Sequence, residues 1–129
     1  MDGNTVRNTD FAGKVVILNF WATWCPPCRE EVPHFVRLQA KYRDQGLTIV
    51  GLSLDQGGAK VIRPFAEEYE VNYPFLIAND QTADSYGGIV GIPTTFVIDR
   101  SGKIVQRFVG NPGPDVFEQT IRPLLDAAS

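Results

Sequence analysis

The chain has 129 residues, of which 43% are hydrophobic and 21% charged, and its formal net charge is −3 at pH 7. A chain of this length builds the core of one domain without stabilising cross-links, so we expect a single domain spanning residues 1–129. Its apolar content excludes a mainly disordered chain, its longest apolar run is far shorter than a membrane span, and its mild acidity argues against a nucleic-acid partner.

The first half of the chain alternates predicted strands with predicted helices. A β-branched apolar run predicts a buried strand over Lys14–Phe20, and apolar residues at helical spacing predict a helix over Arg29–Asp44. Pro33 lies inside this helix, removes one backbone hydrogen bond and is expected to kink it. The same patterns predict a strand over Leu47–Leu54 and a helix over Ala59–Glu70.

The second half contains shorter predicted elements. The sequence predicts a short strand over Phe75–Ala78 and a helical turn over Thr82–Tyr86. Strands over Thr94–Asp99 and Lys103–Val109 follow, and a turn at Gly102 joins them into an antiparallel hairpin. The chain closes with a predicted amphipathic helix, which is marked by Val116, Phe117, Thr120, Ile121, Leu124 and Leu125.

The order of these elements predicts the fold class. Two early strand–helix–strand units imply parallel strands joined by right-handed crossovers, and the late hairpin adds an antiparallel edge. We therefore expect an α/β fold with a mixed central β-sheet flanked by helices on both faces.

The only two cysteines, Cys25 and Cys28, stand on either side of Pro26 and Pro27 in a Cys-Pro-Pro-Cys motif. Residues three apart share a helix face, so the two sulfur atoms are close enough to bond. Cys25 lies at the positive end of the helix dipole, which favours its thiolate, the form that attacks disulfides. The pattern predicts that Cys25 attacks a disulfide and that Cys28 resolves the mixed disulfide.

The two prolines limit how strongly this thiolate is stabilised. Neither Pro26 nor Pro27 has a backbone N–H to donate, so the first available donor is the amide of Cys28. We therefore predict a modest depression of the Cys25 pKa and a couple that acts as a reductant or exchanger.

Two alternatives to a redox pair remain open at this point. The cysteines could form a purely structural disulfide, although so short a loop contributes little stability. A zinc site needs about four ligands, and the only histidine, His34, is expected to point away from the Cys28 face. We therefore expect no metal and no cofactor, and we interpret His34 as a surface or packing residue.

Further candidates lie on both sides of the proposed reaction centre. Trp24 precedes Cys25 and is interpreted as an apolar shoulder for substrate, with core packing as the alternative, whereas Trp21 is interpreted as a packing residue. Ile92 and Pro93 lead into a predicted strand. Pro93 either marks a strand edge or forms a cis bond that exposes backbone groups to an extended peptide substrate.

The segment FWATWCPPCREEVP at residues 20–33 resembles the active-site segment of thioredoxin-like proteins, above all the TlpA/ResA branch of extracytoplasmic thiol–disulfide oxidoreductases. The resemblance extends through VGLSLD at 50–55, GIPTTF at 91–96 and IDRSGKI at 98–104, and thus covers nearly the whole chain. It implies a thioredoxin fold, with Cys25 as the exposed nucleophile and Cys28 as the buried resolving cysteine.

The resemblance also implies roles for other residues and for partners. Pro93 matches the family's cis-proline, Ile92 matches the residue whose backbone receives substrate, and Pro33 matches the helix-kinking proline. Members of the family reduce disulfides in exported proteins, often apocytochrome c before haem attachment. They usually draw electrons from a membrane thiol–disulfide transporter. A monomer on the periplasmic side of the membrane is therefore expected.

The sequence departs from the family pattern at two acidic positions. Thioredoxins carry a buried acid six residues before the first cysteine, where this chain has Asn19. ResA-like proteins place a glutamate near the active site after the second strand, where the only nearby carboxylate is Asp55. Asp55 is therefore a candidate for proton transfer, and the alternative is a residue that caps the following turn.

The location and two competing functions stay open. The first ten residues contain no apolar signal segment, which suggests a cytoplasmic protein or one whose leader or anchor has been removed. A redoxin that reduces peroxides would need an activating arginine beside Cys25. A metallochaperone or redox-sensing module would need a histidine far downstream of the cysteines, and the chain has none.

Overall fold

The computed structural model describes residues 13–55, 57–77 and 91–126. Its five-stranded sheet has the order β3-β2-β1-β4-β5 and is built from β1 (Val15–Trp21), β2 (Leu47–Ser53), β3 (Phe75–Ile77), β4 (Thr94–Ile98) and β5 (Ile104–Val109). Strands β1, β2 and β3 are mutually parallel, whereas β4 is antiparallel to β1 and to β5. The predicted mixed sheet and the thioredoxin fold are confirmed.

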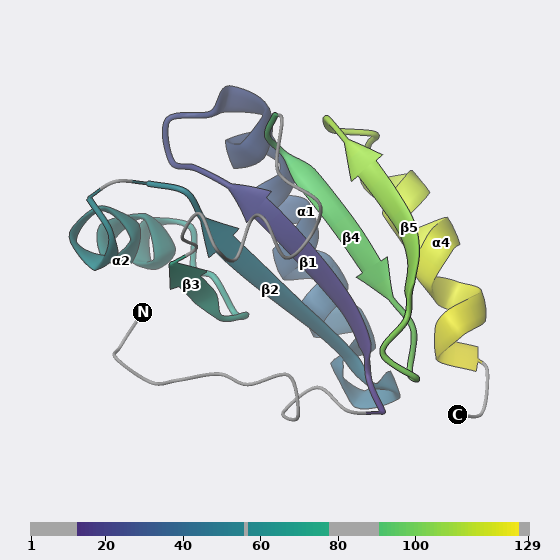
Figure 1. Ribbon diagram of the computed structural model, residues 1–129. Coiled ribbons are helices and arrows are strands. Elements are labelled where there is room, and N and C mark those ends of the chain that lie inside the picture. Colours follow the sequence, from purple (N-terminus) through teal and green to yellow (C-terminus); the bar gives the residue numbers. More distant parts are fainter. Residues whose placement is uncertain (1–12, 56, 78–90, 127–129) are drawn as a thin grey trace.

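Within the described ranges, three α-helices accompany the sheet: α1 (Pro26–Tyr42), α2 (Ala59–Glu68) and α4 (Pro114–Asp126). Figure 1 shows α1 and α4 behind the sheet and α2 beside its β3 edge. All three contribute buried side chains, such as Phe35, Phe65 and Phe117, to one cluster that packs on one face of the sheet. The predicted helical turn over Thr82–Tyr86 lies outside the described residues, so the cover of the second face by a helix stays a prediction.

The two faces of the sheet follow from the alternation of side chains along β1. Val15, Ile17 and Trp21 point into the cluster beneath the helices. The intervening side chains of β1 point to the opposite face, where they form a second buried cluster with side chains of β2 and β4. This cluster consists of Val16, Leu18, Phe20, Val50, Leu52 and Phe96. Because β1 is central and buried on both faces, it fixes the loop that follows it.

Helix α1 begins three residues earlier than the apolar periodicity predicts. Pro26 and Pro27 occupy its first two positions, where a missing N–H costs nothing. The helix runs through Pro33 to Tyr42, and a short 3₁₀ turn, Arg43–Gln45, completes it. Gly46 then takes the left-handed conformation, φ 98°, and starts the connection to β2.

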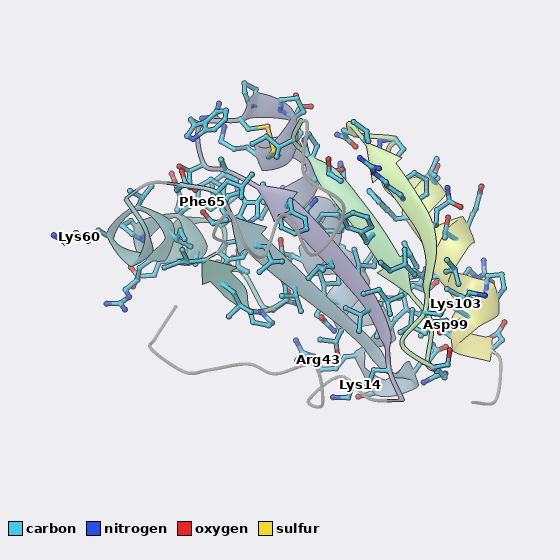
Figure 2. All side chains as sticks on the ribbon, in the orientation of Figure 1. Lys14, Arg43, Lys60, Phe65, Asp99 and Lys103 are labelled. Atoms are coloured by element: carbon cyan, nitrogen blue, oxygen red, sulfur yellow. A yellow bond between two sulfur atoms is a disulfide. The ribbon has the colours of Figure 1, made fainter. Side chains whose placement is uncertain are left out.

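Strand pairing brings distant segments to one edge of the sheet. Trp21 pairs with Ser53 and Phe20 pairs with Thr94, so the ends of β1 and β2 lie beside the start of β4. The loop after β1 and the residues before β4 therefore meet at this edge. Figure 2 shows the disulfide sulfur atoms there, at the end of the sheet opposite the labelled Lys14 and Arg43.

Candidate functional site

Cys25 and Cys28 are joined in a disulfide, and their Cα atoms are 5.2 Å apart. This distance lies within the usual range for disulfides. The short loop between β1 and α1 carries Cys25 to the helix N-terminus, where it is the capping residue in an extended conformation. The pair is therefore bonded at the place where the sequence predicts a redox centre.

The first turn of α1 supplies a single backbone donor to Cys25. The N–H of Cys28 donates to the Cys25 Sγ over 3.4 Å, whereas Pro26 and Pro27 have no N–H. The expectation that Cys28 provides the first donor is confirmed. On the other side of the sulfur, the carbonyl oxygen of Ile92 lies 3.8 Å from Cys25 Sγ. The carbonyl oxygen carries partial negative charge and therefore destabilises a Cys25 thiolate, whereas the N–H of Cys28 stabilises it.

The two cysteines of the disulfide differ little in exposure, whereas the tryptophan beside them is exposed. Cys25 is 5% exposed and Cys28 1%, so Cys25, which the resemblance implied to be exposed, is itself buried and only slightly more accessible than Cys28. Trp24, directly before it, is 66% exposed, which excludes the core-packing interpretation of this residue. Trp21 is buried among Phe65 and Phe75, as its interpretation as a packing residue requires.

The peptide bond between Ile92 and Pro93 is cis, as the resemblance implies. The carbonyl oxygen of Pro93 accepts a hydrogen bond from Gly110 N at 2.8 Å, which ties this segment to the end of β5. Thr94 Oγ1 donates to the carbonyl oxygen of Gly91 at 2.6 Å. The backbone on both sides of Pro93 is thus held in place, with the Ile92 carbonyl beside Cys25.

Asp55 lies just after β2 and is buried, but its carboxylate is fully engaged. It accepts hydrogen bonds from the backbone N–H and the hydroxyl of Thr23, and from the hydroxyl of Ser53. These contacts join the end of β2 to the loop that precedes Cys25.

A second buried carboxylate, Glu31, was missed by the sequence-based analysis. Glu31 is 1% exposed and lies one turn after Cys28 on α1. Asn19 Nδ2 donates to Glu31 Oε1 at 3.3 Å and to Thr95 Oγ1 at 2.8 Å, while Glu31 Oε2 has no partner among the described residues. Burial raises the pKa of Glu31 to about 8, against the lowering effect of the Asn19 hydrogen bond.

One signal in the sequence points to Glu31. The positions Cys28, Glu31, Phe35 and Leu38 recur at three- and four-residue intervals, which is the spacing of the buried face of a helix. Glu31 belongs to the charged run Arg29-Glu30-Glu31, which suggests a solvent-exposed surface. The burial of Glu31 is therefore not evident from the sequence.

His34 takes no part in the cysteine site. Its ring nitrogen is hydrogen-bonded to Arg37 on the same helix. Its pKa is lowered, mainly by burial and also by Arg37. In the described ranges, no group of three or more metal-binding side chains comes together.

Comparison with known proteins places this geometry in a family. The model of the AhpC/TSA family matches residues 1–107. The thiol–disulfide oxidoreductase ResA of Bacillus thuringiensis subsp. konkukian is 32% identical over 124 residues, which cover 96% of this chain and 71% of that protein. The chain belongs to the AhpC/TSA family, among the ResA-type thiol–disulfide oxidoreductases. ResA of Oceanobacillus iheyensis is 42% identical over 105 residues, which cover 81% of this chain and 54% of that protein.

Solved structures agree with this assignment. A thiol:disulfide interchange protein of the thioredoxin family from Chlorobium tepidum TLS has a TM-score of 0.88 and 34% identity, covering 96% of this chain and 88% of that one. A secreted thiol–disulfide isomerase from Corynebacterium glutamicum has a TM-score of 0.90 and 27% identity, covering 97% and 78%. This ResA-type chain is therefore a thioredoxin-like oxidoreductase with a Cys-Pro-Pro-Cys disulfide. Across the described ranges, no helix combines the length and apolar character that crossing a bilayer requires.

Proposed function

We propose that this ResA-type protein reduces or exchanges disulfides in exported proteins, and that Cys25 makes the attack. The observation that supports this most strongly is a disulfide at a helix N-terminus, beside an exposed Trp24 and a cis-Pro93. The Cys25 thiolate attacks one sulfur of the substrate disulfide, and the other substrate sulfur leaves as a thiolate and takes up a proton.

Cys28 completes the reaction. Its thiol loses a proton and attacks Cys25 Sγ in the mixed disulfide, so the second substrate sulfur leaves. The substrate gains two electrons, and the enzyme is left with the Cys25–Cys28 disulfide. A membrane thiol–disulfide transporter is the proposed source of the electrons that reopen it.

Glu31 is the carboxylate best placed to accept the proton that the Cys28 thiol releases. It lies on the helix face of Cys28, one turn further on, and its pKa of about 8 allows it to exchange a proton near neutral pH. Asp55 remains a candidate from the sequence, but its engaged oxygens favour an anchoring role.

Trp24 and the backbone at Ile92 and Pro93 form the proposed substrate surface. An extended segment next to the substrate disulfide would lie against the indole and along the cis-proline backbone. The proposed location is extracytoplasmic, with cytochrome c maturation as the proposed pathway and a monomer as the working state. The relatives named ResA and the secreted isomerase from Corynebacterium support the location.

A trapping experiment tests the proposal. With Cys28→Ser, Cys25 is expected to remain attached to its substrate as a mixed disulfide in cells, and mass spectrometry of the adduct identifies the protein. Cys25→Ser is the matched control, because it should capture nothing. Equal capture by both variants would contradict the assigned order of attack.

Peroxide reduction is the competing activity. Cys25 Sγ lies near the Cys28 amide and the Ile92 carbonyl, and no arginine in the described ranges donates to it. Reduced protein is therefore expected to consume a protein disulfide much faster than hydrogen peroxide. Faster turnover of the peroxide would favour the redoxin alternative.

A further inference from the structure

Three side chains bind the loop before Cys25 to the end of β2, and we call Thr23, Ser53 and Asp55 the loop clamp. Asp55 Oδ2 accepts from Thr23 N at 3.0 Å and from Ser53 Oγ at 2.6 Å. Asp55 Oδ1 accepts from Thr23 Oγ1 at 2.7 Å and lies 3.2 Å from Thr23 N. Ser53 Oγ in turn accepts from Asp55 N at 3.0 Å.

Backbone bonds make the clamped loop a tight turn. Cys25 N donates to the carbonyl oxygen of Ala22 at 3.2 Å, which closes a four-residue turn with Thr23 and Trp24 at its centre. Leu54 N donates to the carbonyl oxygen of Trp21 at 2.8 Å, so the turn departs from paired strands. Thr23 is the residue of this turn that Asp55 holds, and the next two residues are the exposed indole and the attacking sulfur.

The hydrogen bonds of the loop clamp hold the Asp55 carboxylate in one position. An ionised carboxylate only accepts hydrogen bonds, and both oxygens of Asp55 accept from the donors around them, with Thr23 N shared between the two. Charge-assisted bonds of this kind are short and strong, and Asp55 is only 7% exposed. A proton acceptor for a cysteine needs a free oxygen directed at that cysteine, whereas both oxygens of Asp55 are directed at Thr23 and Ser53.

We propose that Asp55 is a positioning residue that acts through Thr23, and that the loop clamp fixes Trp24 and Cys25 Sγ in the arrangement that a protein disulfide requires. This inference rests on the proposed function, because it assigns how the same site is oriented. It replaces proton transfer by Asp55 with a mechanical role for its carboxylate. It also assigns roles to Thr23 and Ser53.

Substitution at Thr23 separates the hydroxyl bond from everything else in the turn. Thr23→Val keeps the shape and the backbone N–H but removes the Oγ1 donor, whereas Thr23→Ser retains it. We expect Thr23→Val to slow the reduction of a protein disulfide about ten-fold, as displacement of a reacting group does, and Thr23→Ser to reduce it at the wild-type rate. Normal rates for Thr23→Val, or equal losses for both variants, would overturn the proposal.

Alkylation of Cys25 by iodoacetamide gives a readout that does not depend on disulfide turnover. A loosened turn weakens the contact between Cys25 Sγ and Cys28 N–H, so the pH midpoint of alkylation should rise by a few tenths of a unit in Thr23→Val and not in Thr23→Ser. If the wild type reduces no protein disulfide, the proposed function fails, and the alkylation midpoints still decide whether the clamp exists. An unchanged midpoint in Thr23→Val counts against the clamp.

A second pair of variants covers loss of folding and distinguishes proton transfer. Ser53→Ala removes the hydroxyl that donates to Asp55 Oδ2 and leaves the turn itself unaltered. If Thr23→Val does not fold, Ser53→Ala takes its place and should show the slowed disulfide reduction expected of a weakened clamp. In the clamp, Thr23→Val adds little to the loss caused by Asp55→Asn, because both break the same unit. Losses that multiply, together with a normal Ser53→Ala, would show that Asp55 acts independently of Thr23.

Discussion

The sulfur of Cys25, the proposed nucleophile, contacts one favourable and one unfavourable dipole. The amide of Cys28 donates to Cys25 Sγ, and the helix terminus adds its partial positive charge. The carbonyl oxygen of Ile92, 3.8 Å away, opposes negative charge on the same atom. Since the prolines remove the remaining donors of the first turn, the Cys25 thiolate has less support than a helix N-terminus can give.

This balance gives a prediction for the two prolines. A capping side chain accepts from the second or third residue of a helix, and Pro27 occupies the second position of α1. Pro27→Ala therefore adds a donor facing Cys25 and should lower the Cys25 pKa, making the protein a stronger oxidant. Pro26→Ala, at the first position, is the matched control and should change the pKa little. Ultraviolet absorbance of the thiolate during a pH titration measures both values.

The pKa of Cys25 in the wild-type protein is itself a prediction. We expect the Cys25 pKa to lie modestly below the ordinary value of about 8.5, and not near the extreme of about 3.5 known for strongly oxidising proteins. An equal fall in pKa for Pro26→Ala and Pro27→Ala would contradict the role assigned to the second position.

Individual residues also show where prediction from sequence stops. The cysteine pair and its likeness to thioredoxin-like motifs were enough to place Cys25 at a helix N-terminus and to expect the cis bond at Pro93. Glu31 was missed because its environment comes from other strands. Its partner Asn19 is 12 positions away, and Asn19 also binds Thr95, which is 76 positions from it. Desolvation depends on such packing, which periodicity along one helix does not report.

At the scale of the elements, β2 is paired with β1 along its whole length, but in the described part of the chain β3 covers only the end of its other edge. Among the described residues, β3 pairs with residues 51–53 of β2. The side chain of Gln39 hydrogen-bonds to the backbone of the earlier residues of β2. Gln39 Nε2 donates to the carbonyl oxygen of Leu47, and its Oε1 accepts from Ile49 N, both at 2.8 Å. Helix α1 thus supplies the bonds that a longer β3 would have made, and this covers an edge that could otherwise pair with another chain.

Sequence patterns located these elements but not all of their ends. The strand predicted over Lys14–Phe20 is offset from β1 by one residue at each end, and the one over Leu47–Leu54 exceeds β2 by one residue, because β-branched apolar runs mark buried strands well. The Cys-Pro-Pro-Cys motif predicted that the helix opens at Cys25, as observed, whereas the apolar periodicity begins only at Arg29 because prolines carry no hydrophobic signal. The predicted end of the second helix, Glu70, has a positive φ of 53° and lies beyond α2.

Close packing between β2 and β3 gives a prediction at this scale. A Cβ atom on Gly51 would lie 2.7 Å from Phe75 Cδ1 and 3.0 Å from Trp21 Nε1, and both rings are buried. Gly51→Ala should therefore reduce the free energy of unfolding by about 1–3 kcal/mol, the usual cost of overpacking. Gly91→Ala is the control, because its Cβ meets nothing within 4 Å. Denaturant unfolding of the oxidised proteins measures the difference, and equal stabilities would contradict the proposed crowding.

At the scale of the whole molecule, the two ends of the sheet differ in how completely a charged side chain is hydrogen-bonded. At the end away from the disulfide, the Arg100 guanidinium donates to the carbonyl oxygens of Gly13, Gln45 and Leu125, and so joins three separate segments. At the disulfide end, the Glu31 carboxyl is buried with one oxygen unpartnered in the described part of the chain. The first arrangement stabilises the fold, whereas the second costs stability whenever the carboxyl is ionised.

This cost predicts how stability depends on pH. The pKa of Glu31 is about 8 in the folded protein and 4.5 as its reference value, so between these pH values the folded state keeps a proton that the unfolded state has released. The stabilisation that goes with this proton is complete below pH 4.5 and is lost as pH rises towards 8. The free energy of unfolding should fall by a few kcal/mol across that window, since each pKa unit corresponds to about 1.4 kcal/mol.

Glu31→Gln isolates this contribution, because the amide keeps the shape of the carboxyl and does not titrate. Chemical unfolding of the oxidised proteins between pH 5 and 8 should show a decline for the wild type and a smaller one for Glu31→Gln. His34, whose pKa is lowered, acts in the opposite direction near its own titration, and its effect cancels in the difference between the two proteins. A difference that stays constant with pH would mean that Glu31 is ionised throughout, and would also remove it as the proton partner of Cys28.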